Sequence, residues 1–182
     1  MIQLEQFIER ELKILVTKEV FEKILNSYEF NKPVNQTNTY YDSNDEFLKK
    51  QRGAMRIRTI QDKKIFTLKL RKDEVTHYEY EKEIDVDTLQ AIKDKEIQKW
   101  LSDFNIPKDV SPIVTFSTRR YTCDLENGQL CADMTSYENH IDYELEYEYF
   151  NDHDGIKVFN EILKPFGLTY EKNCSSKIAR AM

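Results

Sequence analysis

Hydrophobic and polar residues alternate with a period of two along much of the chain, which is the pattern of β-strands whose two faces meet different surroundings. In the segment ERELKILV, Glu9, Glu11 and Lys13 share one parity, and Leu12 and Ile14 share the other. Similar stretches recur in both halves of the chain. The predicted strands are 9–16, 37–43, a stretch beginning at Met55, 65–71, 77–86, 112–125, 128–137 and 141–150.

Apolar residues at helical spacing replace the alternation in three places, and a short helical fragment is predicted to end near Gly53. The predicted main helices are the segment after an N-cap at Thr17, a segment from Asp87 or Thr88 to Leu101, and 155–164. The order of elements in the second half repeats that of the first in outline. We therefore predict an α+β fold with about eight strands in two pseudo-repeated halves.

Composition limits the classes of function. The 182 residues are 40% hydrophobic and 33% charged, which is typical of one domain, 1–182. The net charge of -6 argues against general binding to nucleic acid or anionic membranes. Three cysteines without C-x-x-C spacing indicate neither a disulfide framework nor a zinc site, so we expect reduced thiols and a cytoplasmic location. The sequence has no apolar run typical of a signal peptide or membrane span.

The charges are sorted by strand, and this is unusual for solvated faces. Same-face residues two apart in a strand lie about 6.5 to 7 Å apart, so a pair of glutamates repels by about 2 kcal/mol at an effective dielectric near 20. Uniform acidic pairs nevertheless occur at Glu9/Glu11, Glu81/Glu83 and Glu144/Glu146, while other strands carry uniform positive charge. We therefore predict that the charged faces converge on one interior, in a closed barrel with a polar lumen and helices outside.

The acidic and the basic side chains of the lumen would both be neutralised if the lumen bound a polyanion together with a cation. Carboxylates at alternate positions are oxygen ligands suited to Mg²⁺ or Mn²⁺. Arg56, Arg58, Lys69 and Arg120 would donate to phosphate oxygens.

The E-x-E-x-K pattern at 9–13 resembles the N-terminal signature of the CYTH superfamily, the triphosphate tunnel metalloenzymes, which include inorganic triphosphatases, thiamine triphosphatases and class IV adenylate cyclases. Similar motifs follow in the family's order along almost the whole chain: YYDS, the R-x-R of Arg56 and Arg58, TLK with Lys69, FSTRR with Arg120, CADM with Asp133, YELEYE with Glu144 and Glu146, and SSKIAR with Lys177 and Arg180.

The resemblance implies a single tunnel domain of eight antiparallel strands and a role for each charged group. The implied metal ligands are Glu9, Glu11, Asp133, Glu144 and Glu146, of which Glu9, Glu11 and Glu146 are also expected to be catalytic. The implied substrate-binding residues are Lys13, Arg56, Arg58, Lys69, Arg120, Lys177 and Arg180. Glu81 and Glu83 fit a further acidic position, although Glu79 shares their parity and leaves the register open. His77, His140 and His153 are expected at the surface.

The leading functional hypothesis is Mg²⁺- or Mn²⁺-dependent hydrolysis of a linear triphosphate, with no side-chain nucleophile. Inorganic triphosphate, thiamine triphosphate and ATP remain open as substrates. A class IV type cyclase that forms cyclic AMP and pyrophosphate is the first alternative. A module that binds polyphosphate or a nucleotide without turnover is the second. We expect a small-molecule partner containing a triphosphate, no nucleic acid or membrane partner, and a monomer or homodimer.

Overall fold

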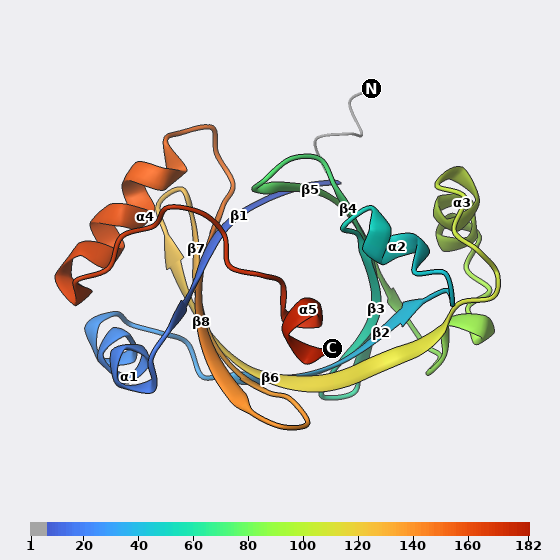
Figure 1. Cartoon of the computed structure of the whole chain (residues 1–182), viewed down its shortest axis with the longest axis horizontal. Helices are drawn as coiled ribbons and strands as arrows, with labels where there is room; N and C mark the ends of the chain where they lie inside the picture. The colour runs from blue at the N-terminus through green and yellow to red at the C-terminus, as the bar shows by residue number, and fades with distance from the viewer. Residues whose placement is uncertain (1–6) are drawn as a thin grey trace.

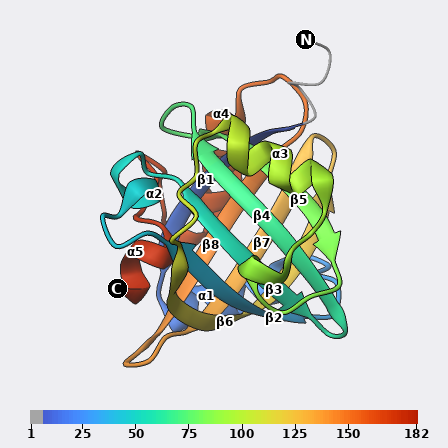
Figure 2. The ribbon, with the colours of Figure 1, turned by 90° about the vertical axis from the view of Figure 1, so that its right-hand side faces the viewer.

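The computed structural model describes residues 7–182, in which eight antiparallel strands close into a barrel (Figures 1 and 2). The elements are β1 (Ile8–Val16), α1 (Lys18–Ser27), β2 (Val34–Asp42), α2 (Phe47–Lys50), β3 (Ala54–Ile60), β4 (Lys63–Arg71), β5 (Thr76–Ile84), the 3₁₀ turn η2 (Leu89–Ala91), α3 (Lys95–Asp103), β6 (Ser111–Leu125), β7 (Gly128–Ser136), β8 (Ile141–Tyr149), α4 (Gly155–Leu163), the 3₁₀ turn η3 (Lys164–Phe166) and α5 (Lys177–Ala181).

The strand order around the barrel is β1-β5-β4-β3-β2-β6-β7-β8. Strands β2 to β5 form one antiparallel meander, and β6 to β8 continue into β1 to form the other. The predicted closed α+β barrel with two halves is therefore confirmed. Closure pairs β1 with both β5 and β8, so residues from the start of the chain lie beside residues from its middle and its end.

The apolar core lies outside the barrel wall, between the strands and the helices. On one side, α3 packs Ile97 and Trp100 against Phe66 and Leu68 of β4. On the opposite side, α1 and α4 cover an apolar cluster that includes Leu12. Figure 1 shows α3 apart from α1 and α4, on opposite flanks of the ring of strands. Because the apolar parity of each strand is used on the outside, the charged parity faces the lumen.

The second predicted helix differs from the structure. In place of one helix from residue 87 or 88, the chain forms η2, returns to extended backbone at Ile92, and starts α3 after Asp94. The Asp94 carboxylate accepts a hydrogen bond from the backbone N–H of Ile97, so it caps the helix. The cap fixes the helix start closer to Trp100 than the apolar spacing alone indicated.

The last helix, α5, lies across one opening of the barrel in Figure 1 and beside α2 at the same end in Figure 2. Its Ile178 and Ala181 pack against an aromatic cluster of Tyr40, Phe116 and Tyr137. The C-terminal segment thereby places Lys177, its first residue, next to the lumen. Within residues 7–182, no helix is both long and apolar enough to span a membrane.

Candidate functional site

The lumen holds a cavity of about 290 Å³ whose walls are mostly charged. Its position follows from the strand alternation, which directs every second side chain of β1, β3, β4 and β5 inward. The lining residues are Glu9, Glu11, Lys13, Tyr40, Arg52, Gly53, Ala54, Arg56, Arg58, Lys69, His77, Glu79, Glu81, Arg120, Glu146, Glu148, Ser176, Lys177 and Ile178. The sequence prediction of a shared, charged interior is confirmed in this respect.

One part of the wall is an open acidic cluster, which we define as Glu9, Glu11, His77, Glu79 and Glu148. All five side chains line the cavity. The Lys69 ammonium lies between two of the carboxylates, with its Nζ 2.5 Å from Glu9 Oε1 and 3.3 Å from Glu11 Oε1. Lys13 Nζ lies 3.6 Å from Glu11 Oε1. Four carboxylates thus face two ammonium groups, and the open cluster carries an excess of negative charge.

The excess charge changes the pKa values of the carboxyl groups. Burial together with the charges of Glu9 and Glu11 raises the pKa of Glu148 to about 8. Burial also raises the pKa of Glu9, against the opposing effect of Lys69. The open cluster therefore favours uptake of positive charge, either as protons or as a cation.

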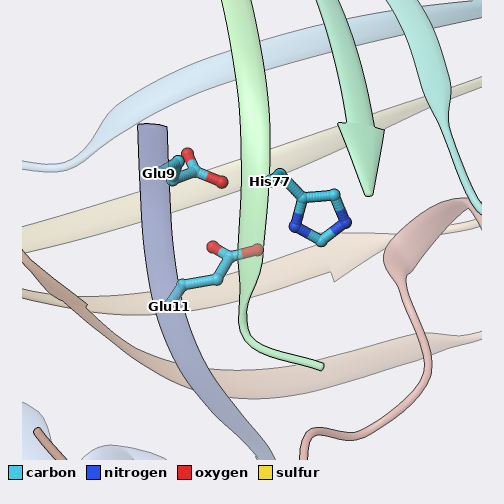
Figure 3. Close-up of side chains that lie close together, drawn as sticks. All are labelled: Glu9, Glu11 and His77. Atoms are coloured by element: carbon cyan, nitrogen blue, oxygen red, sulfur yellow. The ribbon is translucent and has the colours of Figure 1, made fainter. Parts of the chain in front are cut away.

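Sequence reasoning placed His77 wrongly, since it lines the cavity and is half-buried. Its Nδ1 is buried without a hydrogen-bond partner, and burial next to Lys69 lowers the pKa of the imidazole to about 4. In Figure 3 the ring lies beside the carboxylates of Glu9 and Glu11. His77 shares its parity with Glu79, which was the available signal, but its position near the start of β5 resembled a surface turn. His140 is exposed, as expected, whereas His153 is half-buried, with its Nε2 2.9 Å from the hydroxyl of buried Tyr147.

A second acidic group, the covered trio, consists of Asp133, Glu144 and Glu146 on β7 and β8. Lys177 Nζ lies among them, 2.8 Å from Asp133 Oδ2, 2.6 Å from Glu144 Oε2 and 2.6 Å from Glu146 Oε1. Arg120 forms a bidentate salt bridge with Asp133, and its Nη2 lies 3.1 Å from Glu146 Oε2. These cations hold the pKa of Glu146 well below its usual range, although burial alone would raise it.

The opposite wall is basic and contains donors whose partners in the protein are neutral. Arg58 Nε donates to Asn38 Oδ1 at 2.7 Å, and Arg56 Nη1 donates to the Tyr40 hydroxyl at 3.3 Å. Arg56 Nε is buried without a hydrogen-bond partner. Burial, Arg56 and Arg120 lower the pKa of Arg58 to about 9, because neighbouring positive charges disfavour its own charge. An anion with several oxygens would satisfy these donors and relieve the repulsion.

The predicted site residues fall into three groups by position. Glu9, Glu11, Lys13, Arg56, Arg58, Lys69, Arg120, Glu146 and Lys177 line the cavity together, as does Glu81, which accepts a hydrogen bond from Thr67. Asp133 and Glu144 are fully buried behind Lys177, and Arg180 pairs there with Asp142 and Glu144, so none of these three lines the cavity. Glu83 is exposed outside it, whereas Glu79 lies inside.

The register of β5 against β4 explains why Glu79 lines the cavity and Glu83 does not. Glu79 pairs with Lys69 across β4 and β5, while Glu83 pairs with Ile65, which lies further toward the far end of the barrel. The acidic position is therefore occupied by Glu79 and Glu81 rather than by Glu81 and Glu83. The parity was visible in the sequence, but the depth along the barrel axis was not.

Two sets of side chains have the composition of a metal site. The ligand atoms of Glu9, Glu11 and His77 lie within 4.8 Å of one another, and so do those of Asp133, Glu144 and Glu146. The first set fits a divalent cation, because it is open to the cavity, belongs to the open acidic cluster and includes an unpaired ring nitrogen; Lys69 lies beside its two carboxylates. In the second set the ammonium of Lys177 already lies between the carboxylates.

Comparison with known proteins agrees with the geometry. The family model described as the CYTH domain matches residues 8–181. "Putative triphosphatase YjbK" of Bacillus subtilis (strain 168) is 27% identical over 183 residues, which cover 97% of this chain and 95% of that protein.

Two solved structures are similar over nearly their whole lengths. One is a "putative adenylate cyclase" from Bacillus halodurans, with 32% identity, a TM-score of 0.80, and coverage of 94% of this chain and 96% of that one. The other, from Hippeastrum, is described as a "putative adenylyl cyclase" that "reveals a dominant triphophatase activity"; it shares the fold at 22% identity and a TM-score of 0.73, covering 94% of this chain and 93% of that one. With a family model that covers almost all of its residues, this chain belongs to the CYTH domain family.

Proposed function

We propose that this protein hydrolyses a linear triphosphate with the help of a divalent cation. The observation that carries the proposal is the division of one cavity into two walls. Arg56 and Arg58, whose hydrogen-bond partners are the neutral Tyr40 and Asn38, form a basic wall, and the open acidic cluster lies on the other side. A polyanion on the first wall and a cation on the second would neutralise each other and both walls.

The residues of the cavity have separate roles in this reaction. Arg56, Arg58 and Arg120 bind the phosphate oxygens and neutralise charge that develops on them during transfer. A divalent cation held at Glu9 and Glu11 would polarise the phosphate oxygens and orient the attacking water. Burial and its acidic neighbours raise the pKa of Glu148 to about 8, so its ionised form is basic enough to accept the proton of that water.

Inorganic triphosphate is the substrate that the cavity favours. Among the described lining residues, Tyr40 is the one phenyl-type ring, and it is packed on Phe116 and covered by α5. A nucleobase or thiazolium ring would therefore have few flat apolar surfaces on which to stack. The Bacillus subtilis relative named "Putative triphosphatase YjbK" and the activity stated for the Hippeastrum protein are consistent with hydrolysis.

A cyclase that converts ATP into cyclic AMP and pyrophosphate is the second candidate. It is favoured by the 32% identity to the Bacillus halodurans protein, which is described as a "putative adenylate cyclase". The same arginines and carboxylates would bind the phosphates of ATP. The products distinguish the two reactions, because hydrolysis releases orthophosphate and cyclisation releases pyrophosphate.

The purified protein should be assayed with inorganic triphosphate, thiamine triphosphate and ATP, each with Mg²⁺ or Mn²⁺. We expect orthophosphate, fastest from inorganic triphosphate, and its loss in Glu9→Gln with the circular dichroism spectrum unchanged. Glu126→Gln, an exposed residue of the β6–β7 hairpin, is the matched control. Cyclic AMP with pyrophosphate would support the cyclase. Tight substrate binding without product under all metals would indicate a binding module and contradict both enzymes.

A further inference from the structure

The two carboxylate groups of the barrel each contact a lysine, but they differ in how completely their carboxylates are paired and in their access to the cavity. In the covered trio, the Lys177 ammonium is 2.6 to 2.8 Å from all three carboxylates. Asp133 and Glu144 have no exposed surface, and neither lines the cavity. A metal ion could enter only by displacing a fully paired ammonium from a buried position, which is electrostatically costly. The trio is therefore neutralised by the protein itself.

The open cluster has the opposite properties. Glu9, Glu11, Glu79 and Glu148 all line the cavity, and within residues 7–182 the ion pairs of this cluster are formed with Lys69 and Lys13. Carboxyl groups thus outnumber the ammonium groups of this cluster, which favours the uptake of a cation. These carboxylates already face the cavity, so a cation can reach them. It need not displace Lys69 from all of its partners, because the Nζ of Lys69 also lies 3.8 Å from Glu79 Oε2.

The backbone itself places a nitrogen ligand in this cluster. Glu9 and His77 are directly opposite residues of the antiparallel pair β1–β5. Side chains at such positions start about 4.5 to 5.5 Å apart at Cβ and point to the same face of the sheet. Strand register therefore places the two side chains on the same face and close together at Cβ, as Figure 3 shows. Nδ1 of His77 is buried and has no hydrogen-bond partner.

From this geometry we propose that the protein binds its divalent cation at Glu9, Glu11 and His77, with a ring nitrogen of His77 as a direct ligand, and that this nitrogen makes the site select Mn²⁺ or Co²⁺ over Mg²⁺. Mg²⁺ prefers oxygen ligands and its own water shell, whereas imidazole strengthens binding of transition metals in the Irving–Williams order. This inference rests on the proposed function only in that a cation is needed for turnover. Measuring metal binding in the absence of substrate tests the inference separately from the reaction.

The test measures nitrogen coordination directly. Metal-free protein receives substoichiometric Mn²⁺, and electron spin-echo envelope modulation is recorded for wild type, His77→Gln and His140→Gln. His140 is an exposed histidine of the β7–β8 hairpin, so its variant removes an imidazole without touching the cavity. We expect the modulation of a coordinated imidazole nitrogen in wild type and His140→Gln, and its absence in His77→Gln.

Titration calorimetry with each metal gives the second readout. We expect tighter binding of Co²⁺ and Mn²⁺ than of Mg²⁺ to wild type, and a loss of about tenfold in Mn²⁺ affinity in His77→Gln with little change for Mg²⁺. Circular dichroism verifies that the variant is folded, and His77→Asn replaces it if it is not.

Each contrary result has one meaning. A wild-type spectrum without nitrogen modulation, or one that His77→Gln does not change, overturns the assignment of His77 as a ligand. Equal affinity for Mg²⁺ and Mn²⁺ in wild type overturns the selectivity. If nitrogen coordination is found but no triphosphate is hydrolysed, the metal site stands and the proposed function fails. If hydrolysis occurs without nitrogen coordination, the proposed function stands and the metal inference fails.

Discussion

Arg120 and Asp133 face each other across β6 and β7 and form two hydrogen bonds, from Nε to Oδ1 at 2.8 Å and from Nη2 to Oδ2 at 2.7 Å. Asp133 has no exposed surface, and Lys177 lies 2.8 Å from its Oδ2. A carboxylate behind the cavity thus fixes the orientation of two cations that face it. The covered trio organises the basic residues of the lumen, and this role requires no metal.

Replacing Asp133 with Asn should destabilise the protein by about 3 kcal/mol, because Arg120 and Lys177 then keep their charges in a buried position with one partner fewer. Urea unfolding followed by circular dichroism measures the change. Asp124→Asn is the control, since Asp124 is an exposed residue of β6. A loss no greater than that of the control would contradict the view that the trio balances buried positive charge.

Replacing Arg58 with Gln should lower kcat/KM for inorganic triphosphate by roughly 10- to 100-fold, since a charge-assisted hydrogen bond contributes about 1.5–3 kcal/mol. Stability should change little, because the guanidinium pairs with the neutral side chain of Asn38 and is repelled by Arg56.

Arg119→Gln is the matched control for this experiment. Arg119 lies next to Arg120 in sequence but is exposed, and its Nε donates to the Tyr121 hydroxyl. Similar kinetics in the two variants would show that the inward position of Arg58 has no part in substrate binding.

Stability of the metal-free protein should fall as the pH rises toward 8, because of Glu148. Its pKa rises from an ordinary value of 4.5 to about 8 on folding, so between these values the folded protein holds a proton that the unfolded chain has lost. The free energy of unfolding therefore decreases with pH in this window. Glu148→Gln, which cannot ionise, should flatten the profile and be more stable than wild type at pH 8.

Urea midpoints at several pH values, with a chelator present, give this profile. Glu126→Gln, on an exposed hairpin, should follow the wild-type curve. Parallel curves for wild type and Glu148→Gln would mean that the Glu148 carboxyl does not carry the excess proton.

Replacing Lys177 with Met should open the covered trio to a metal ion. The side chain keeps a similar length but loses the ammonium that lies among Asp133, Glu144 and Glu146. We expect the number of tightly bound Mn²⁺ ions per chain, counted by electron paramagnetic resonance titration, to rise from one to two. Lys99→Met on the exposed face of α3 should leave the count at one. A folded Lys177→Met protein that still binds one ion would show that the trio is not a latent cation site.

Strand alternation was sufficient to predict which face of several strands turns toward the lumen. Glu9, Glu11 and Lys13 share a parity, and a strand directs alternate side chains to the same face whatever the surrounding fold. The same reasoning gave Arg56 and Arg58 their common orientation. Apolar residues at helical spacing predicted a helix from residue 87 or 88, and this prediction was wrong. The α-helix begins only after Asp94, because the side chain of Asp94 caps it there.

Depth along the barrel was not encoded in the alternation. Glu79, Glu81 and Glu83 have the same parity, yet Glu83 is outside the cavity, because cavity depth depends on the stagger of β5 against β4. His77 shares this parity as well, and its contact with Glu9 exists because closure of the barrel pairs β5 with β1.

The sequence by itself determined the strand pattern, the inward parity and the kinds of charge that the lumen contains, since these depend on neighbours within one strand. Only the tertiary structure decided which charges meet. Lys177 reaches Glu146 from the last helix, and His77 reaches Glu9 across the closing strand pair, because contacts between distant segments depend on register and closure. The position of Lys177 leaves the covered trio neutralised by the protein, and the position of His77 adds a nitrogen to the open acidic cluster, which remains accessible to a cation.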